Sequence, residues 1–178
     1  MKEIFVGSSK EGLEQATQVV DVLSEVKDVK PLLWTECFKL GDITFLSIES
    51  LARRIAGAVF LATPDDDSVI REQRVRTPRA NVLFEYGYLS AMLTRSRVAL
   101  CRYTTAELPS DFAGVTYVPM GLFEPARPLD PEARARLKSW ATELPAIQVG
   151  FSPTYQMHGY SGGWKVEMVY EVYRRIPL

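Results

Sequence analysis

The sequence predicts an open, parallel α/β sheet in flavodoxin-like order, with about five strands, helices on both faces and a C-terminal extension. Two observations lead to this fold class. Short apolar runs alternate with amphipathic helical patterns over the first 145 residues. One run, Ala58 to Ala62, is apolar on both faces, as expected for a central parallel strand that helices cover. A chain of 178 residues is long enough to bury one such core without disulfides or metals.

The first elements are a strand, a helix and a second strand. Ile4 to Val6 is a short apolar run, and apolar residues then recur at helical spacing from Leu13 to Val26. Val29 to Trp34 predicts the second strand. Pro31 indicates that this strand lies at an edge, because proline cannot donate to a central ladder. A loop from Thr35 to Gly41 is expected to follow.

The middle of the chain continues the alternation. A second helix is expected over 42–55, with Asp42 as its N-cap. After the central strand, the polar residues 67–78 predict a long loop, and loops of that length in compact domains are usually functional or mobile. The third helix should extend over 78–94 or 81–94.

Two more strands and one more helix complete the domain. The apolar runs Val98–Cys101 and Val115–Val118 predict the fourth and fifth strands. Asp130 is a suitable N-cap and Pro131 suits the first helical position, so a helix is expected from there to about Leu144.

The C-terminal segment departs from this rhythm. Residues 145–163 predict a loop, and the alternating pattern over 164–173 predicts a strand with no evident partner. We therefore expect a domain over residues 1–145 and an extension over 146–178, which starts or links to a missing sensor domain. An unpaired strand of this kind invites docking.

Composition excludes several function classes. With 21 basic and 22 acidic residues the net charge is −1, which is unsuited to holding a nucleic acid. One histidine, His158, and two cysteines, Cys37 and Cys101, cannot build a Cys/His zinc site, and no metal or cofactor is expected. The cysteines indicate reduced thiols, and no run is apolar enough to predict a membrane span or a signal peptide, so a cytoplasmic location is expected.

The predicted sheet places a ligand crevice between its first and third strands. In such folds ligands bind beyond the carboxyl ends of the strands, where the winding direction reverses. The walls would be Gly7-Ser8-Ser9 and Thr63 to Asp66, which suit a nucleotide-sized ligand. Gly7-Ser8-Ser9 matches no standard phosphate-binding motif, so a simple turn and helix cap is the alternative.

Glu85 is the most unusual residue of the third helix. Apolar or aromatic residues flank it on every helical side, so it does not lie on a solvated face. The helix N-terminus favours the ionised carboxylate and burial opposes it, and we expect the ionised form in a wet cleft. A buried acid requires either a partner, for which Arg79 is the candidate, or a function.

Other residues near the crevice have both a structural and a functional interpretation. Trp34 and Phe38 flank the loop after the second strand and suit stacking on a flat base, although aromatic residues there are more often core. Asp65, with the two aspartates that follow it, suits a magnesium ion or a ribose hydroxyl, although a solvated loop is the alternative.

These residues together resemble the bacterial TIR-like domains, the effector modules of antiviral systems triggered by cyclic nucleotides. The resemblance covers about residues 3 to 120 and includes the block Asn81-Val82-Leu83-Phe84-Glu85-Tyr86-Gly87. One departure is Ala80, where the group often has an acid. The resemblance also includes three further segments: Ile4 to Ser9 with Glu11, Leu33-Trp34 with Phe38, and Phe60 with Pro64-Asp65-Asp66.

The resemblance implies NAD⁺ hydrolysis between nicotinamide and ribose, with Glu85 as the catalytic residue and NAD⁺ as substrate rather than cofactor. It also implies self-association through contacts between TIR domains, driven by a sensor domain or a partner that responds to cyclic nucleotides. Position gives the candidates for holding the dinucleotide: Ser8, Ser9, Trp34, Phe38, Asp65 and Asn81.

Two alternatives to a hydrolase stay open. One is a non-catalytic TIR scaffold that binds partners or a nucleotide signal without consuming it. The other is a flavodoxin-like domain that binds FMN or accepts a phosphate, although the acids after the third strand are offset from a receiver's expected site.

Overall fold

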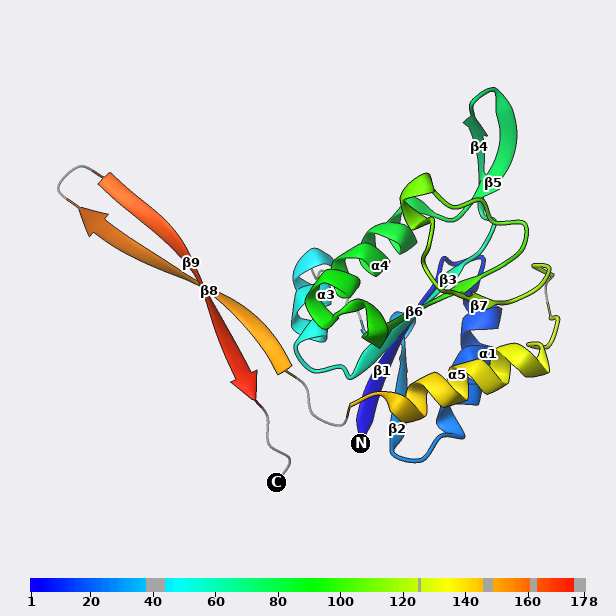
Figure 1. The fold of residues 1–178 in the computed structure, drawn as a ribbon, viewed down its shortest axis with the longest axis horizontal. Coiled ribbons are helices and arrows are strands. Elements are labelled where there is room, and N and C mark those ends of the chain that lie inside the picture. The colour runs from blue at the N-terminus through cyan, green and yellow to red at the C-terminus, as the bar shows by residue number, and fades with distance from the viewer. Residues whose placement is uncertain (38–43, 125, 146–148, 161–162, 175–178) are drawn as a thin grey trace.

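A computed structural model describes residues 1–37, 44–124, 126–145, 149–160 and 163–174. Its main sheet has five parallel strands in the order β2-β1-β3-β6-β7, which confirms the predicted flavodoxin-like α/β class (Figure 1). The strands are β1 (Lys2–Gly7), β2 (Val29–Leu33), β3 (Gly57–Ala62), β6 (Val98–Arg102) and β7 (Val118–Pro119). The helices are α1 (Leu13–Ser24), α2 (Trp34–Cys37), α3 (Thr44–Ala52), α4 (Ala80–Leu93) and α5 (Pro131–Glu143), with 3-10 turns at Arg95–Arg97 and Ser110–Phe112.

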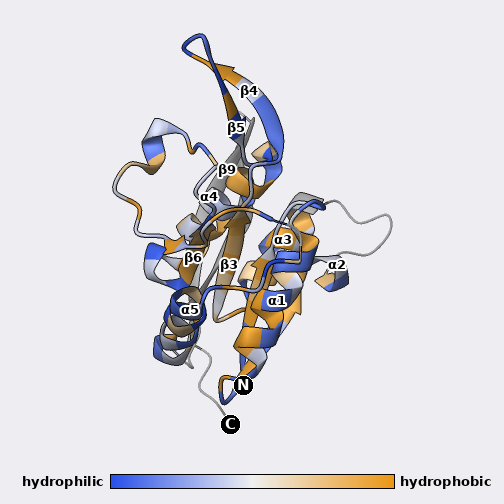
Figure 2. Ribbon diagram, turned by 90° about the vertical axis from the view of Figure 1, so that its right-hand side faces the viewer, coloured by the Kyte–Doolittle hydropathy of each residue, from blue (hydrophilic) through white to orange (hydrophobic). Residues whose placement is uncertain are grey.

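Helices cover both faces of the sheet. Alternate residues of a strand point to opposite faces, so each central strand contributes to two cores. Ile4 and Val59 belong to the core under α1 and α5, whereas Phe5 and Phe60 belong to the core under α3 and α4. Figure 2 shows β3 as a largely hydrophobic strand between the helical layers. The prediction from its continuous apolar run is confirmed, since every residue of β3 is buried.

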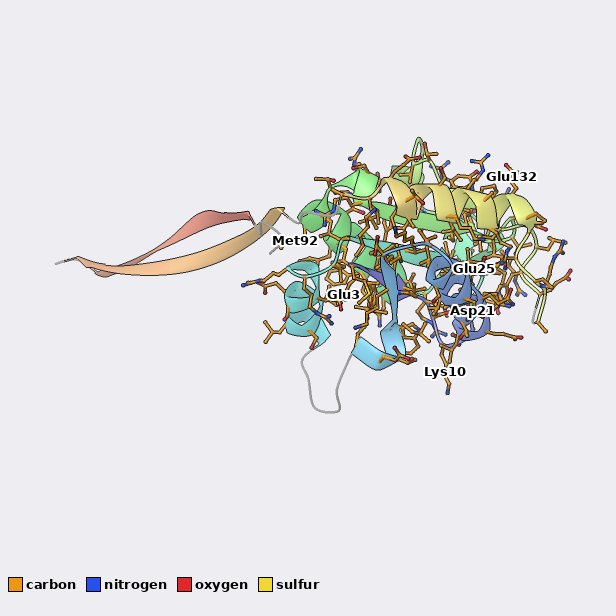
Figure 3. All side chains as sticks on the ribbon, turned by 90° about the horizontal axis from the view of Figure 1, so that it is seen from below. Glu3, Lys10, Asp21, Glu25, Met92 and Glu132 are labelled. Atoms are coloured by element: carbon orange, nitrogen blue, oxygen red, sulfur yellow. The ribbon has the colours of Figure 1, made fainter. Side chains whose placement is uncertain are left out.

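Charged side chains lie on the outside of this arrangement. Figure 3 shows Lys10 pointing away from the body and Glu132 on the outer side of α5. Glu25 joins α1 to α5 through ion pairs with Arg134 at 2.8 Å and Lys138 at 2.5 Å. None of the helices in the described ranges has the length and apolar character needed to span a membrane.

Phe60 fixes the position of α4. Its ring makes edge contacts with Phe5 of β1, at a centroid distance of 5.7 Å, and with Tyr86 of α4, at 6.1 Å. The same ring passes close to Gly7 at the end of β1, where an added Cβ would lie 2.6 Å from the Phe60 Cε1 atom. Only glycine therefore allows the strand end and α4 to approach the ring together.

The segment after β3 is not the long loop that its polarity predicted. It forms the antiparallel hairpin of β4 (Asp66–Ile70) and β5 (Gln73–Thr77). The strands pair residue for residue, with Asp67 opposite Arg76 in an ion pair of 3.3 Å. Cross-strand pairing of opposite charges stabilises a strand whose side chains are mostly in water. The hairpin projects away from the sheet (Figure 1).

Several boundaries differ from the expected ones. The edge position of β2 is confirmed, but the strand ends at Leu33 and Trp34 begins the short helix α2, where a loop was expected from Thr35. The fifth strand is shorter than predicted, because β7 contains only Val118 and Pro119. The predicted N-cap Asp42 lies outside the described residues.

The C-terminal segment was predicted wrongly in its first half. The expected loop contains β8 (Val149–Tyr160), and the last strand, β9 (Gly163–Arg174), pairs with it in antiparallel register. The last strand therefore has a partner within the chain. Proline and glycine in β8 obscured its alternation in the sequence. The boundary between a domain at 1–145 and an extension at 146–178 stays a prediction.

Truncating Phe60 should destabilise the domain strongly. Phe60→Ala removes a fully buried ring between β1 and α4, and we expect the free energy of unfolding to fall by about 3 to 5 kcal/mol in urea titrations. Leu122→Ala, at a position that is 48% exposed, is the control and should change it by about 0.5 kcal/mol or less. Equal effects of the two variants would contradict the role assigned to the Phe60 ring.

Candidate active site

A cleft of about 390 Å³ opens at the carboxyl end of β1. Its walls come from the loop after β1, from the start of α2 and from the first half of α4. The volume lies within the usual range for small-molecule sites. Four of the predicted binding residues and the predicted catalytic residue line it. The lining residues are Ser8, Ser9, Lys10, Glu11, Trp34, Arg79, Asn81, Val82 and Glu85.

Trp34 is held in the cleft by its indole nitrogen. Nε1 donates to the Ser8 hydroxyl at 3.0 Å, and that hydroxyl donates to the Ser9 carbonyl at 2.9 Å. These two bonds fix the edge of the indole while the side chain stays partly exposed. A fixed, partly exposed aromatic ring is suited to stacking against a planar ligand group.

Ser9 belongs to a chain of hydrogen bonds behind the cleft wall. Its hydroxyl accepts from the Gly12 amide at 3.1 Å and shares a bond of 3.1 Å with the Thr63 hydroxyl. Thr63 donates to the Asp65 carboxylate at 2.9 Å, so Ser9 must donate to Thr63. The only proton of the Ser9 hydroxyl is thus used within the protein, and Ser9 shapes the wall.

Asp65 is not among the residues that line the cleft. Burial raises the pKa of its carboxyl, against the hydrogen bond from Thr63 that favours the ionised form. Its place behind Thr63 makes it a support for the loop after β1. The sequence indicated the correct end of the sheet but could not show that Thr63 stands between Asp65 and the cleft.

The three consecutive aspartates diverge. Asp65 faces Thr63, Asp66 pairs with Arg79 at 3.5 Å, and Asp67 pairs with Arg76 at 3.3 Å. They do not converge on a point where a magnesium ion would sit. In the parts of the chain that the structure describes, no group of three His, Cys, Asp or Glu side chains has a geometry suited to a metal ion.

Arg79, the candidate partner that the sequence offered for Glu85, pairs with other acids. Its guanidinium donates to Glu11 at 2.6 Å and pairs with Asp66 at 3.5 Å. Arg79 is the N-cap residue of α4, and its side chain lies at the rim, where it joins the loop after β1 to the base of the hairpin. Neither acid was recognisable as a partner in the sequence, because Asp66 belongs to the hairpin that was not predicted and Glu11 lies 68 positions away in the loop after β1.

Glu85 lies at the sixth position of α4 and faces the cleft. Within the described residues, no hydrogen bond or ion pair reaches its carboxylate. Burial raises the pKa of Glu85 to about 7, so near neutral pH the carboxyl is about half protonated and is not held fully ionised as expected. The field of the helix N-terminus fades beyond the first turn, and no donor offsets the desolvation. Near neutral pH the group exchanges a proton readily.

The remaining predicted site residues differ in their placement. Asn81 is exposed and lines the cleft one turn before Glu85. Phe38 lies outside the described residues. Gly87 does not mark close packing, because an added Cβ there would meet no atom within 4 Å.

Residues 3–121 match the family model described as CAP12/Pycsar effector protein, TIR domain. The chain is 38% identical over 127 residues to CD-NTase-associated protein 12 of Flavobacterium daejeonense, covering 71% of this chain and 39% of the relative. It is 32% identical over 118 residues to the Pycsar effector protein PaPycTIR of Pseudomonas aeruginosa, covering 65% and 38%. The chain thus spans about two fifths of these curated relatives.

One solved structure, a flavodoxin-like domain from a Synechococcus species, aligns over 79% of this chain and 94% of its own length. The TM-score is 0.42 and the identity 11%, a likeness that carries no conclusion. The flavodoxin-like order of the present sheet rests on its own strand pairing.

Replacing Glu85 by glutamine should stabilise the fold in a pH-dependent way. Below pH 4.5 the carboxyl is protonated in both the folded and the unfolded chain, and the two proteins should have similar melting temperatures. Between pH 4.5 and about 7 the folded protein retains a proton that the unfolded chain has lost, so its stability falls as pH rises. Glu85→Gln has no ionisable group at this position, so its melting temperature at pH 8 should be higher than that of the wild type.

The control is Glu107→Gln, which removes a carboxylate from an exposed position in the loop between β6 and β7. Thermal unfolding of wild type and both variants at pH 4.5 and pH 8 provides the comparison. A Glu85→Gln protein that gains no stability at pH 8 relative to this control would show that the carboxyl is not desolvated.

Proposed function

The chain belongs to the CAP12/Pycsar effector TIR-domain family, and from this premise we propose that it hydrolyses NAD⁺ to nicotinamide and ADP-ribose. The observation that carries the proposal is the Glu85 carboxyl, which lies in a cleft of ligand size with no described partner. A desolvated acid with no structural partner is typical of a catalytic group. Its environment also contains the hydroxyl, amide and indole groups that suit a nucleotide.

The chemistry suits a single carboxylate. Breaking the bond between C1′ of ribose and the nicotinamide nitrogen leaves the electron pair on nicotinamide, which departs as a neutral molecule without a general acid. Positive charge then develops on the ribose as an oxocarbenium ion, and a fixed carboxylate beside it stabilises that charge. Water adds to C1′ and loses a proton, which an ionised Glu85 can accept.

The other lining residues have complementary roles in this proposal. The Trp34 ring stacks on a base of the dinucleotide, and the Asn81 amide bonds a ribose hydroxyl. Lys10 at the rim supplies positive charge toward the diphosphate, whereas Arg79 is paired with Glu11 and Asp66 and holds the rim in shape. Ser8, Ser9 and Asp65 hold the wall in shape through their hydrogen bonds. Phe38 stays a candidate from the sequence alone.

The proposal includes regulation by assembly. The relatives carry the names of CD-NTase-associated and Pycsar effector proteins, and this chain spans about two fifths of their length. We propose that the chain acts in the cytoplasm in anti-phage defence, where a sensor domain or partner that responds to a cyclic nucleotide clusters the TIR domains. An isolated dilute domain should then have low activity.

Substitution of Glu85 provides the direct test. Clustered wild-type protein should release nicotinamide from NAD⁺, measured by liquid chromatography, and Glu85→Gln should lower the rate by about 100-fold or more. Glu143→Gln, at an exposed position of α5 outside both the cleft and the hairpin, is the matched control and should keep the wild-type rate. NAD⁺ left intact by clustered wild type would instead favour the non-catalytic scaffold.

The pH dependence of the rate should follow the Glu85 carboxyl. If the ionised form stabilises the cationic ribose, kcat/KM rises with pH and levels off above a midpoint near 7. The rise should be absent from the residual activity of Glu85→Gln. A wild-type profile that is flat between pH 5.5 and 8.5 would contradict this assignment.

A further inference from the structure

The hairpin of β4 and β5 presents an apolar tip to solvent. Val69 is 71% exposed and Ile70 is 43% exposed, and both lie next to the turn of the hairpin. Charged residues surround them, with Arg74 opposite Val69 across the two strands. Exposed apolar side chains gathered on a projecting element are typical of a contact surface.

The turn of this hairpin holds two charged residues in an unfavourable backbone conformation. Arg71 and Glu72 connect the strands and have φ angles of 49° and 67°, a left-handed conformation that favours glycine or asparagine. Each of these residues costs backbone energy that an Asn-Gly turn would avoid. The chain nevertheless places a cation and an anion at the tip.

The base of the hairpin is fixed to the domain. The Arg76 guanidinium donates to the Pro64 carbonyl at 2.8 and 3.1 Å and to the Asp65 carbonyl at 3.0 Å. The Glu107 amide donates to the Arg76 carbonyl at 2.8 Å. A projecting tip on an anchored base loses little conformational entropy on binding.

A second cleft lies along the other flank of α4, with a volume of about 630 Å³. Its apolar wall contains the Phe112 and Tyr86 rings, whose centroids are 5.5 Å apart. Gly87 leaves this side of the helix open, since an added Cβ would meet no atom within 4 Å. Arg95 and Asp111, both exposed, bring one positive and one negative charge to the cleft.

We propose that the hairpin tip of one copy docks in this second cleft of a neighbouring copy. Val69 and Ile70 pack against the Phe112 ring, the arginine at position 74 pairs with Asp111, and Glu72 pairs with Arg95. The tip combines exposed apolar side chains with Arg74 and Glu72, and the cleft combines an apolar wall with Asp111 and Arg95, so each of these two tip charges has an opposite charge to meet. Both surfaces belong to this chain, and we therefore take a second copy as the occupant. The inference rests on the self-association included in the proposed function.

Tip and cleft are different surfaces, so the contact runs head to tail. Each copy then offers a free tip at one end and a free cleft at the other, and assembly extends to rings or filaments. A hairpin tip buries less area than a standard interface, so a single contact is weak and needs a high local concentration. Arg79, which binds Asp66 at the hairpin base, joins this contact to the rim of the Glu85 cleft.

Reversing the charge of one side chain on each surface tests the contact. Sedimentation velocity of the full chain over rising concentration should show assembly of the wild type. Arg74→Glu and Asp111→Arg should each weaken self-association by about tenfold or more, because like charges then meet at the contact. The double variant should recover it. Arg136→Glu, on the exposed face of α5, is the control and should assemble as the wild type does.

A mixing experiment tests the head-to-tail direction. The double substitution Val69→Asp/Ile70→Asp removes the apolar tip and Gly87→Trp fills the cleft, so a protein with either change alone should be monomeric. An equimolar mixture should form pairs and nothing larger, because each pair uses the one intact tip and the one intact cleft.

Circular dichroism establishes that every variant is folded. Wild type that stays monomeric, folded single variants that assemble normally, or a double variant without recovery would overturn the proposal. Nicotinamide release is measured separately, and the assembly test can be repeated on Glu85→Gln. A failure of hydrolysis therefore leaves the test of the contact intact.

Discussion

Close packing around the Phe60 ring is the constraint on which the rest of this structure depends. The ring contacts Phe5 of the neighbouring strand and Tyr86 of α4, and it leaves no room for a side chain at Gly7. Because interiors are close-packed, this contact sets the distance between α4 and the end of β1. The Glu85 cleft is the space between those two elements, so its width follows from the packing of an apolar residue beneath it.

The same packing explains the state of Glu85. Tyr86 and Val82 bury one side of α4 against the sheet, and Glu85 lies at the border of that buried side. Arg79 is held at the rim by Glu11 and Asp66, so it cannot neutralise the acid. The fold therefore keeps a desolvated carboxyl that has no ion-pair partner among the described residues. Costs of this kind are typical of functional sites.

Much of the sheet and part of the site could be predicted from the sequence, because both follow from local patterns. Continuous apolar runs predicted β1, β3 and β6, and an acid with apolar neighbours singled out Glu85. The hairpin of β4 and β5 was missed because its two-residue turn, Arg71-Glu72, lacks the glycine or asparagine that marks such turns. Its polar strands are stabilised by pairing across the hairpin, which no local pattern displays.

The partners of charged groups could not be predicted for a related reason. Arg79 lies six residues before Glu85, yet it pairs with Glu11, which is 68 positions away, and with Asp66 of the unpredicted hairpin. The pKa of Glu85 then depends on where Arg79 goes and on how much of α4 the sheet covers. The ion pairs of Arg79 and the pKa of Glu85 depend on the tertiary structure, whereas the sequence alone shows that Glu85 is unusual.

Helix α4 has a cleft on each of its two flanks. Val82, Tyr86 and Leu89 recur at helical spacing and bury one stripe against the sheet. Asn81 and Glu85 lie on one side of that stripe, toward the first cleft, and Gly87 and the residues after it lie toward the second. The solvent-exposed positions of the helix include Phe84, Gly87 and Ala91, which are not polar, and this is why its pattern in the sequence is indistinct. One helix therefore lines both clefts, with Asn81 and Glu85 on one flank and Gly87 on the other.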